Sequence, residues 1–499
     1  MQLELKNTNV VSLPESNSFT AYFTLRRVFV WAFLLSLFSL AVRQCSSIDW
    51  DFWWHLKAGQ YIIQTKSIPH IDPFSFTRAG SEWITHEWLS EVIMYAVFRA
   101  GGWIGLFILF GTTITAAWGF CFKRCEGKPF IAALAVVLAT AASAPLFGFR
   151  PQMFTLLLAS IFIAVLDSYL SGNNRRAVWL LPPLMLLWVN LHAGFALGLA
   201  LILLFAAMAA LDREWKRIGP LLLTFFISAT VVPVNPNGFR MFSYPFETLS
   251  APAMQGFIQE WFSPDFHQLR FLPLAALILV TFSAMALSPA RARLSELFAL
   301  AILSFAALRS GRHIPILAIF AAPLFAKYIT HWINSQSNRP ITLRSATATG
   351  PTLILSLVLL LLPTFLIVQR IGDFNSKAAS YEAQKFPAGA VEYIAKQEAP
   401  GRIFNDYNWG GYLIWKFYPE RKVFIDGRAD VYGDGFVFEY LRTYGGERGW
   451  RETLDRFDIQ TVLIQPNSAL TTLLREDKGW RKVFEDDQAV VFARNGSAF

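Results

Sequence analysis

Long runs of apolar residues recur along most of the chain, with short polar segments between them. Eleven such runs approach the roughly 20 residues that a helix needs to cross about 30 Å of hydrocarbon. We predict helices because an isolated strand would leave its backbone polar groups unsatisfied in lipid. The predicted spans are residues 28–45, 102–122, 130–147, 152–170, 177–191, 194–211, 217–234, 269–288, 294–309, 314–331 and 352–369.

The pattern changes from Ser376 onward, where shorter amphipathic segments alternate with β-prone ones. The segments predict helices at 387–397, 412–417, 436–443 and 449–456, strands at 402–404, 422–425 and 461–464, and a closing hairpin over 482–492 that turns at Asp486 and Asp487. The sequence therefore predicts an α-helical polytopic membrane protein of about 11 transmembrane helices with a C-terminal soluble α/β domain. Its parts are a cytoplasmic segment 1–27, a transmembrane domain 28–375 and an extracytoplasmic domain 376–499.

The first external loop, residues 46–101, is too aromatic and apolar for a flexible linker. We expect it to lie on the membrane surface. Its last part, Glu87 to Arg99, predicts an interfacial helix that ends at Gly101 and Gly102 and carries Glu87 and Glu91 on one face.

Composition supports the membrane prediction. The 499 residues are 54% hydrophobic and only 16% charged, which a soluble core of this size could not bury. The excess of basic residues lies in clusters between spans, which is typical of topology signals and argues against nucleic-acid binding. Those clusters are Lys123, Arg124 and Lys128; Arg175 and Arg176; Arg213, Lys216 and Arg217; and Arg291 and Arg293. The positive-inside rule puts them and the N-terminus in the cytoplasm, and the C-terminal domain outside an inner (plasma) membrane.

The densest cluster of polar groups directly follows the first span, in the stretch Asp49-Trp50-Asp51-Phe52-Trp53-Trp54-His55. Two carboxylates at i and i+2 can share a divalent cation, Mg²⁺ or Mn²⁺, or one can accept a proton while the other tunes its pKa. The alternative is a Trp-rich interfacial belt with ordinary solvated acids.

His86 and Glu87 close the same loop, so a second acid and imidazole can return to the neighbourhood of Asp49 and Asp51. Glu87 can equally be a first-turn acid favoured by the helix dipole.

Basic residues also occur on the predicted outer side, where topology does not require them. Together with His192 they would form a site for the phosphate or pyrophosphate of a membrane-anchored lipid. The alternative is that the side chains snorkel to lipid headgroups. They are Arg150, Arg240, Arg309, Arg312 and His313.

The C-terminal domain contributes two further motifs, Asp406-Tyr407-Asn408-Trp409-Gly410-Gly411 and Asp426-Gly427-Arg428-Ala429-Asp430. The glycines suit a close turn into a helix, and the aromatic rings can stack on a sugar or hold the domain against the loop. A purely structural role is the alternative.

These features together resemble the GT-C superfamily of membrane glycosyltransferases. The motif at 49–55, the stretch His86-Glu87-Trp88-Leu89-Ser90-Glu91 and the motif at 426–430 are similar to a large group of bacterial membrane proteins placed in it. The resemblance implies an inverting transfer of sugar from a polyprenyl-phosphate-linked donor, with Asp49 or Asp51 as the catalytic acid/base. The motif at 406–411 departs from the Trp-Trp-Asp-Tyr-Gly motif of oligosaccharyltransferases at the double tryptophan, so peptide recognition is not implied.

The leading hypothesis is transfer to an extracytoplasmic glycan, lipid or protein in the cell envelope. Asp49 first, then Asp51 or Glu87, would deprotonate the acceptor or position it through a divalent ion, with His86 beside them. The predicted substrate-binding residues are Trp54, His55, Arg150, His192, Arg309, Arg312, His313, Asp406, Tyr407 and Trp409. The alternatives are a transporter or flippase for a lipid-linked solute, which would need ionisable groups near mid-membrane, and a non-catalytic scaffold.

Overall fold

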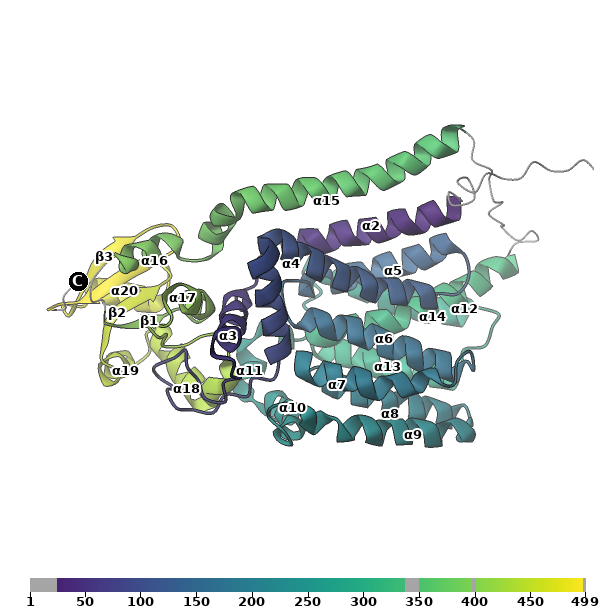
Figure 1. The fold of residues 1–499 in the computed structure, drawn as a ribbon, viewed down its shortest axis with the longest axis horizontal. Helices are drawn as coiled ribbons and strands as arrows, with labels where there is room; N and C mark the ends of the chain where they lie inside the picture. The colour runs from purple at the N-terminus through teal and green to yellow at the C-terminus, as the bar shows by residue number, and fades with distance from the viewer. Residues whose placement is uncertain (1–24, 337–349, 397–400, 497–499) are drawn as a thin grey trace, which may run out of the picture.

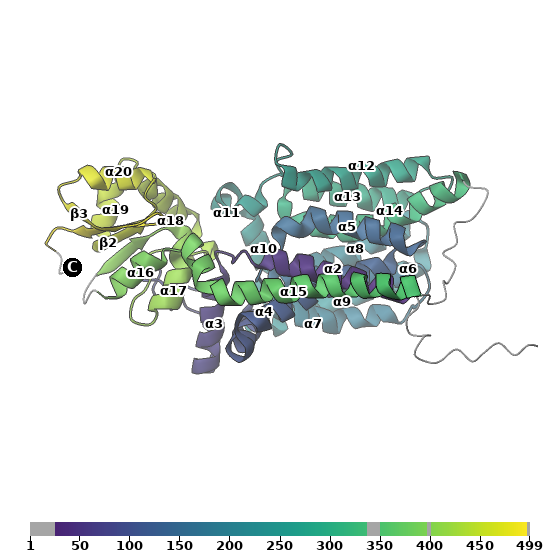
Figure 2. The same cartoon turned by 90° about the horizontal axis from the view of Figure 1, so that it is seen from above.

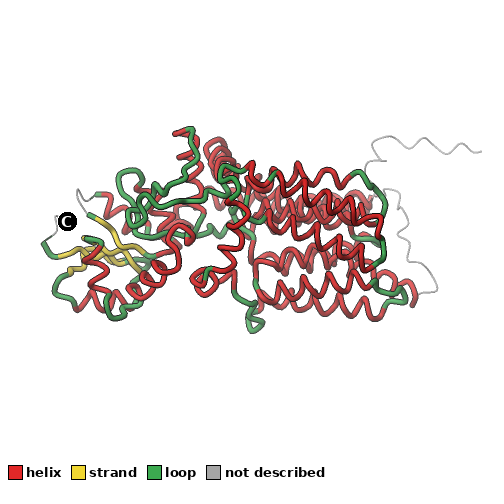
Figure 3. The backbone as a smooth tube through the Cα atoms, turned by 90° about the horizontal axis from the view of Figure 1, so that it is seen from below, coloured by secondary structure: helices red, strands yellow, loops and turns green. Residues whose placement is uncertain are grey.

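A computed structural model describes residues 25–336, 350–396 and 401–496. Its helices form an elongated bundle with the C-terminal domain at one end (Figure 1). Strands of a sheet occur only in that domain among the described residues (Figure 3). The predicted segment 1–27 lies mostly outside the described residues.

The apolar runs form the helices of the bundle. In the part of the chain that the structure describes, eight helices have the length and composition of a membrane span, and each of the eleven predicted segments is helical there. The long ones are α2 (Leu25–Cys45), α4 (Trp88–Arg124), α5 (Pro129–Ser143), α6 (Gln152–Leu170), α9 (Trp215–Thr230), α12 (Leu272–Leu287), α14 (Ile314–Gln336) and α15 (Gly350–Lys385). Shorter apolar helices are α7 (Leu181–Leu191, preceded by η2, Ala177–Leu180) and α8 (Phe195–Leu211). The predicted span 294–309 forms α13 (Leu294–Arg309), a helix of 16 residues.

Apolar side chains on the outside of the bundle are consistent with lipid contact. On α15, Leu361 and Phe365 are 61% and 62% exposed within the protein. Large apolar patches of this kind are unfavourable in water and stable in hydrocarbon. The predicted domain boundary at 376 lies inside α15, which continues to Lys385.

The bundle end remote from the C-terminal domain carries predicted cytoplasmic residues. Arg124, at the end of α4, donates from Nε to Asp167 Oδ2 of α6 at 2.6 Å. The two helices therefore end side by side. In Figure 1, α2 and α15 both run from that end towards the C-terminal domain.

The first external loop folds over the other end of the bundle. Helix α4 breaks at Gly102, whose φ of 54° and ψ of −143° form a backbone conformation that glycine adopts readily and other residues do not. The part before the break runs across the direction of the bundle helices, as an interfacial helix would (Figure 1). Helix α3 (Phe52–Thr65) precedes it and was not predicted, because its run of aromatic residues has no clear helical period.

Several short elements between the spans lie at the same end, with α10 and α11 next to the C-terminal domain in Figure 2. They are η1 (Ala144–Leu146), η3 (Val232–Val234), α10 (Arg240–Ser250), α11 (Pro252–Phe257), η4 (Gln259–Trp261), η5 (Leu269–Phe271) and η6 (Gly311–His313).

The C-terminal domain is built on a mixed sheet in the order β1-β2-β4-β3. Strands β1 and β2 are parallel, and β4 is antiparallel to both β2 and β3. The predicted hairpin is confirmed, with Asp486 N–H donating to Ala489 O across the turn at 2.9 Å. The elements are α16 (Ala388–Ala395), β1 (Arg402–Asn405), η7 (Tyr407–Trp409), α17 (Gly410–Phe417), α18 (Ala429–Tyr444), α19 (Trp450–Arg456), β2 (Ile459–Ile464), α20 (Ala469–Glu476), β3 (Trp480–Glu485) and β4 (Val490–Arg494).

The predicted strand at 422–425 is wrong. Val423 does not join the sheet and pairs instead with the first external loop, where its N–H donates to Phe74 O at 3.0 Å and its carbonyl accepts from Phe76 N–H at 3.1 Å. A β-prone segment needs only one extended partner, and here the loop supplies it. The pairing attaches the domain to the loop.

A buried ion network makes the same attachment. Arg428 lies between Asp426 (Nη2 to Oδ2, 2.7 Å) and Asp72 of the loop (Nη1 to Oδ1, 2.8 Å), with all three side chains almost inaccessible. Tyr432 donates its hydroxyl to Asp426 Oδ2 at 2.6 Å. Buried charges are tolerated when each is paired and hydrogen-bonded, as here.

Tyr432→Phe should therefore destabilise the folded protein. The change removes one hydrogen bond to a buried carboxylate, which contributes about 1.5–3 kcal/mol. A lower Tm in detergent would report the loss, with Tyr381→Phe as control because Tyr381 is 37% exposed. Equal Tm values for the two variants would contradict the assigned role of the network.

Candidate functional site

Asp49 and Asp51 lie in the turn between α2 and α3. Asp49 Oδ1 accepts the backbone N–H of Asp51 at 3.0 Å, and Trp54 Nε1–H donates to Asp51 Oδ1 at 3.1 Å. The C-terminal domain touches the pair at Gly427, where an added Cβ would come within 1.8 Å of Asp51 Oδ1. A side chain at that position would displace the Asp51 carboxylate, so the glycine lets the C-terminal domain lie against Asp51.

An acid–arginine cluster continues from Asp49 and consists of Asp49, Arg150, Glu260 and Arg312. Arg150 Nε lies 3.5 Å from Asp49 Oδ2, and Arg150 also pairs with Glu260. Glu260 Oε2 accepts in turn from Arg312 Nε at 3.2 Å. Carboxylates after the first span and guanidinium groups from two distant loops are therefore brought together.

Glu260 is the member of this cluster that the sequence did not indicate. It is a single acid in a long loop, and no spacing distinguishes it from other loop acids. Burial alone would raise the pKa of its carboxyl, but the charges of Arg150 and Arg312 outweigh burial and lower the pKa to about 2.

A histidine–glutamate cluster lies next to it, made of His55, His86, Glu87, Glu91 and His192. His55 Nδ1 lies 3.6 Å from Glu87 Oε1 and 3.5 Å from Glu91 Oε1. The other oxygen of Glu87, Oε2, lies 3.6 Å from His86 Nε2 and 3.8 Å from His192 Nε2. His55, near the start of the first external loop, and Glu87, further along it, thus lie side by side.

Electrostatics connect the two clusters. Burial raises the pKa of Asp51 to about 7, and the charge of Asp49 adds to the shift. Burial also raises the pKa of Glu87 to about 8, with a contribution from Asp51, and lowers that of His86 to about 4. Groups with such shifted pKa values are often found in catalytic sites.

The site contains a donor set that could hold a metal ion, and it is not the predicted one. His55, Glu87 and Glu91 offer one ligand atom each within 4.8 Å of one another. The predicted metal ligands were Asp49 and Asp51. The guanidinium of Arg150 lies beside Asp49, and Trp54 Nε1–H donates a hydrogen bond to Asp51. Metal binding by Asp49 and Asp51 stays a prediction.

The other predicted residues are placed in different ways. His313 follows Arg312 in η6, and the Tyr407 hydroxyl donates to the Gly427 carbonyl at 3.2 Å beside Asp51. Arg309 is exposed and takes part in none of the ion pairs found among the described residues. Asp406 points into its own domain, where Tyr444 and Gln465 donate to Oδ2 at 2.7 and 3.0 Å, and Trp409 is buried there.

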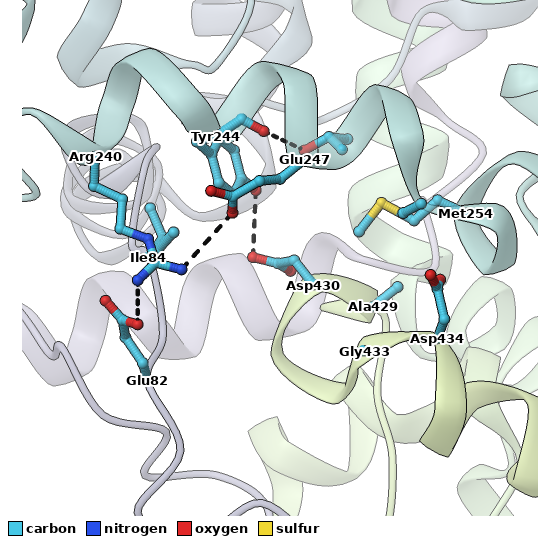
Figure 4. Close-up of a pocket in the computed structure, with 12 residues that line it drawn as sticks. Glu82, Ile84, Arg240, Tyr244, Glu247, Met254, Ala429, Asp430, Gly433 and Asp434 are labelled. Atoms are coloured by element: carbon cyan, nitrogen blue, oxygen red, sulfur yellow. Dashed lines mark hydrogen bonds and ion pairs between the residues drawn. The ribbon is translucent and has the colours of Figure 1, made fainter.

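A cavity of about 150 Å³ opens beside this region, between the first external loop, α10 and α18 (Figure 4). Its wall includes Tyr244. The centroid of the Tyr244 ring lies 4.7 Å from that of the His86 ring, and the Tyr244 hydroxyl donates to Asp430 Oδ2 at 3.3 Å. Arg240, predicted as part of the outer basic group, pairs with Glu82 at 2.5 Å and Glu247 at 3.7 Å at the rim.

No family model matches the chain, and no curated protein matches its sequence. Solved structures do match. ArnT from Cupriavidus metallidurans bound to undecaprenyl phosphate aligns with a TM-score of 0.50 at 12% identity, over 94% of this chain and 98% of ArnT. The oligosaccharyltransferase of Archaeoglobus fulgidus aligns with a TM-score of 0.51 at 12% identity, over 96% of this chain and 75% of that one. The archaeal oligosaccharyltransferase AglB from Archaeoglobus fulgidus, in complex with an inhibitory peptide and a dolichol-phosphate, aligns with a TM-score of 0.51 at 11% identity, over 96% of this chain and 75% of that one. The predicted resemblance is thus confirmed over nearly the whole chain at the level of structure: the protein has the fold of the GT-C membrane glycosyltransferases.

Proposed function

We propose that the protein transfers a sugar from a polyprenyl-phosphate-linked donor to an acceptor hydroxyl outside the cytoplasm. One observation carries the proposal: the partly buried acid–arginine cluster joins Asp49 to arginines from distant loops, and Asp51 interacts electrostatically with it. The fold is that of proteins seen with undecaprenyl phosphate and a dolichol-phosphate, which supports a lipid-linked donor. The positive-inside rule supports an inner-membrane protein with this site on the outer face.

The arginines would hold the phosphate of the donor. As the bond between the anomeric carbon and the phosphate oxygen breaks, that oxygen gains negative charge, and fixed cations stabilise the charge in the transition state. Arg150 and Arg312 now share Glu260, so a donor phosphate would have to replace or join that carboxylate. The lipid phosphate or pyrophosphate is the leaving group.

Asp51 is the better candidate for the general base, although the sequence favoured Asp49. Asp49 is engaged by Arg150, whereas the pKa of Asp51, about 7, suits proton transfer near neutral pH. The acceptor hydroxyl would give its proton to Asp51 while its oxygen attacks the anomeric carbon. A single displacement of this kind inverts the anomeric configuration.

The proposal can be tested directly in proteoliposomes supplied with polyprenyl-phosphate sugars and candidate acceptors. We expect a covalent product whose anomeric configuration, measured by NMR, is opposite to that of the donor. Counterflow of the lipid-linked sugar without any covalent product would instead identify a transporter.

The rate of transfer should depend on pH through Asp51. A base must be deprotonated, so kcat/KM should be constant above about pH 8 and about tenfold lower one pH unit below the pKa of about 7. The measurement is the pH profile of initial rates at subsaturating acceptor. A flat profile between pH 5.5 and 8 would rule out Asp51 as the base.

A further inference from the structure

We infer that His55, Glu87 and Glu91 form a binding site for a divalent transition-metal ion of the zinc class. The three residues come from α3 and from the start of α4, and they differ from the Asp49–Asp51 pair. Binding of the ion does not depend on glycosyl transfer being the activity of the protein.

The spacing of the ligand atoms suits one ion. Zinc binds imidazole nitrogen and carboxylate oxygen at about 2.0–2.2 Å, so two ligands at a tetrahedral angle lie about 3.4 Å apart. His55 Nδ1 is 3.6 Å from Glu87 Oε1 and 3.5 Å from Glu91 Oε1. The three ligand atoms lie within 4.8 Å of one another, so one ion can reach all of them after the two carboxylates adjust.

The three side chains are buried, and the ligand atoms of His55 and Glu91 have no hydrogen-bond partner among the described residues. The side chains of His55, Glu87 and Glu91 are only 3%, 7% and 0% exposed. Among the described residues, neither His55 Nδ1 nor either carboxylate oxygen of Glu91 has a hydrogen-bond partner. An unpaired buried carboxylate is strongly unfavourable, and a bound cation removes that penalty.

The donor set selects the class of metal. One imidazole and two carboxylates in a closed site suit zinc and related ions, whereas Mg²⁺ and Ca²⁺ prefer six or more oxygen ligands, often including water. An ion here would join α3 to α4 and place positive charge beside the acid–arginine cluster.

His192 would orient the site without binding the ion. Its Nδ1 accepts from Gly194 N–H at 3.0 Å and contacts the Thr155 hydroxyl at 2.9 Å, so the neutral ring carries its proton on Nε2. That nitrogen faces Glu87 Oε2 at 3.8 Å. Outer partners of this kind fix the orientation of a ligating carboxylate.

The test is metal content of the full-length protein, with any affinity tag removed. After treatment with a chelator, re-equilibration with Zn²⁺ and desalting, elemental analysis should find about one zinc per chain. Glu91→Gln and His55→Gln should each lower the zinc content at least tenfold, whereas His267→Gln, at an exposed histidine, should not change it. Less than about 0.1 zinc per unmutated chain, or equal content in the Glu91→Gln variant, would overturn the inference.

X-ray absorption at the zinc edge tests the site without any variant. The spectrum should show nitrogen and oxygen ligands with the scattering pattern of one imidazole. Sulfur ligation would assign the ion to Cys45, Cys121 or Cys125 and would refute the site.

Discussion

Asp51→Asn should lower the rate of glycosyl transfer by about 10²–10⁴-fold, the usual contribution of a general base. Asparagine has nearly the same size and keeps an oxygen that can accept from Trp54 Nε1–H, so the turn should stay folded. What it loses is the ability to take the acceptor proton. Initial rates in proteoliposomes at saturating donor would measure the loss.

The matching variant Asp49→Asn distinguishes the role of Asp49 from that of Asp51. It retains the acceptor for the Asp51 backbone N–H but loses the charge facing Arg150, so its effect should appear in donor binding as well as in rate. Asp265→Asn, in an exposed loop, is the control. If Asp49→Asn and Asp51→Asn both kept parental rates, the proposed site would be wrong.

Much of the fold could be predicted from the sequence because the signals are local. Run length alone identifies the membrane helices, and the glycines at 101 and 102 mark the end of the interfacial helix. Helix α3 was not predicted because aromatic residues occupy most of its first turns and hide the alternation of polar and apolar residues that indicates a helix. The segment 422–425 was misassigned because β propensity does not say which strand will be the partner.

The site could be predicted only in part, for a different reason. Asp49, Asp51, His86 and Glu87 stand out because charged groups at a membrane interface are unusual. Arg150 and Glu260 are 110 positions apart, and the residues around each of them do not indicate that the two side chains pair. The same limit explains why Arg309 and Arg312 looked equivalent in the sequence, although only Arg312 reaches Glu260.

Arg150→Gln should lower kcat by about 10²–10³-fold, as expected when one fixed donor to a developing oxyanion is removed. Its side chain is only 11% exposed and contacts both Asp49 and Glu260, whereas that of Arg312 is 29% exposed and pairs with Glu260. Arg312→Gln should therefore have the smaller effect. Arg150→Lys should recover part of the rate, since it keeps the charge but not the planar fork that binds phosphate in two places.

The division of the effect between kcat and KM decides what Arg150 does. A cation that stabilises the leaving phosphate acts mainly in the transition state, so its loss lowers kcat. A cation that only contacts lipid headgroups binds the donor equally strongly in the ground state and in the transition state. Its loss would therefore raise KM for the lipid donor and leave kcat unchanged. Arg270→Gln, at an exposed arginine of the same loop region as Glu260, provides the baseline for surface charge. An Arg150→Gln variant with unchanged kcat would favour the headgroup interpretation. The pairing of Arg150 with Asp49 would then have no role in catalysis.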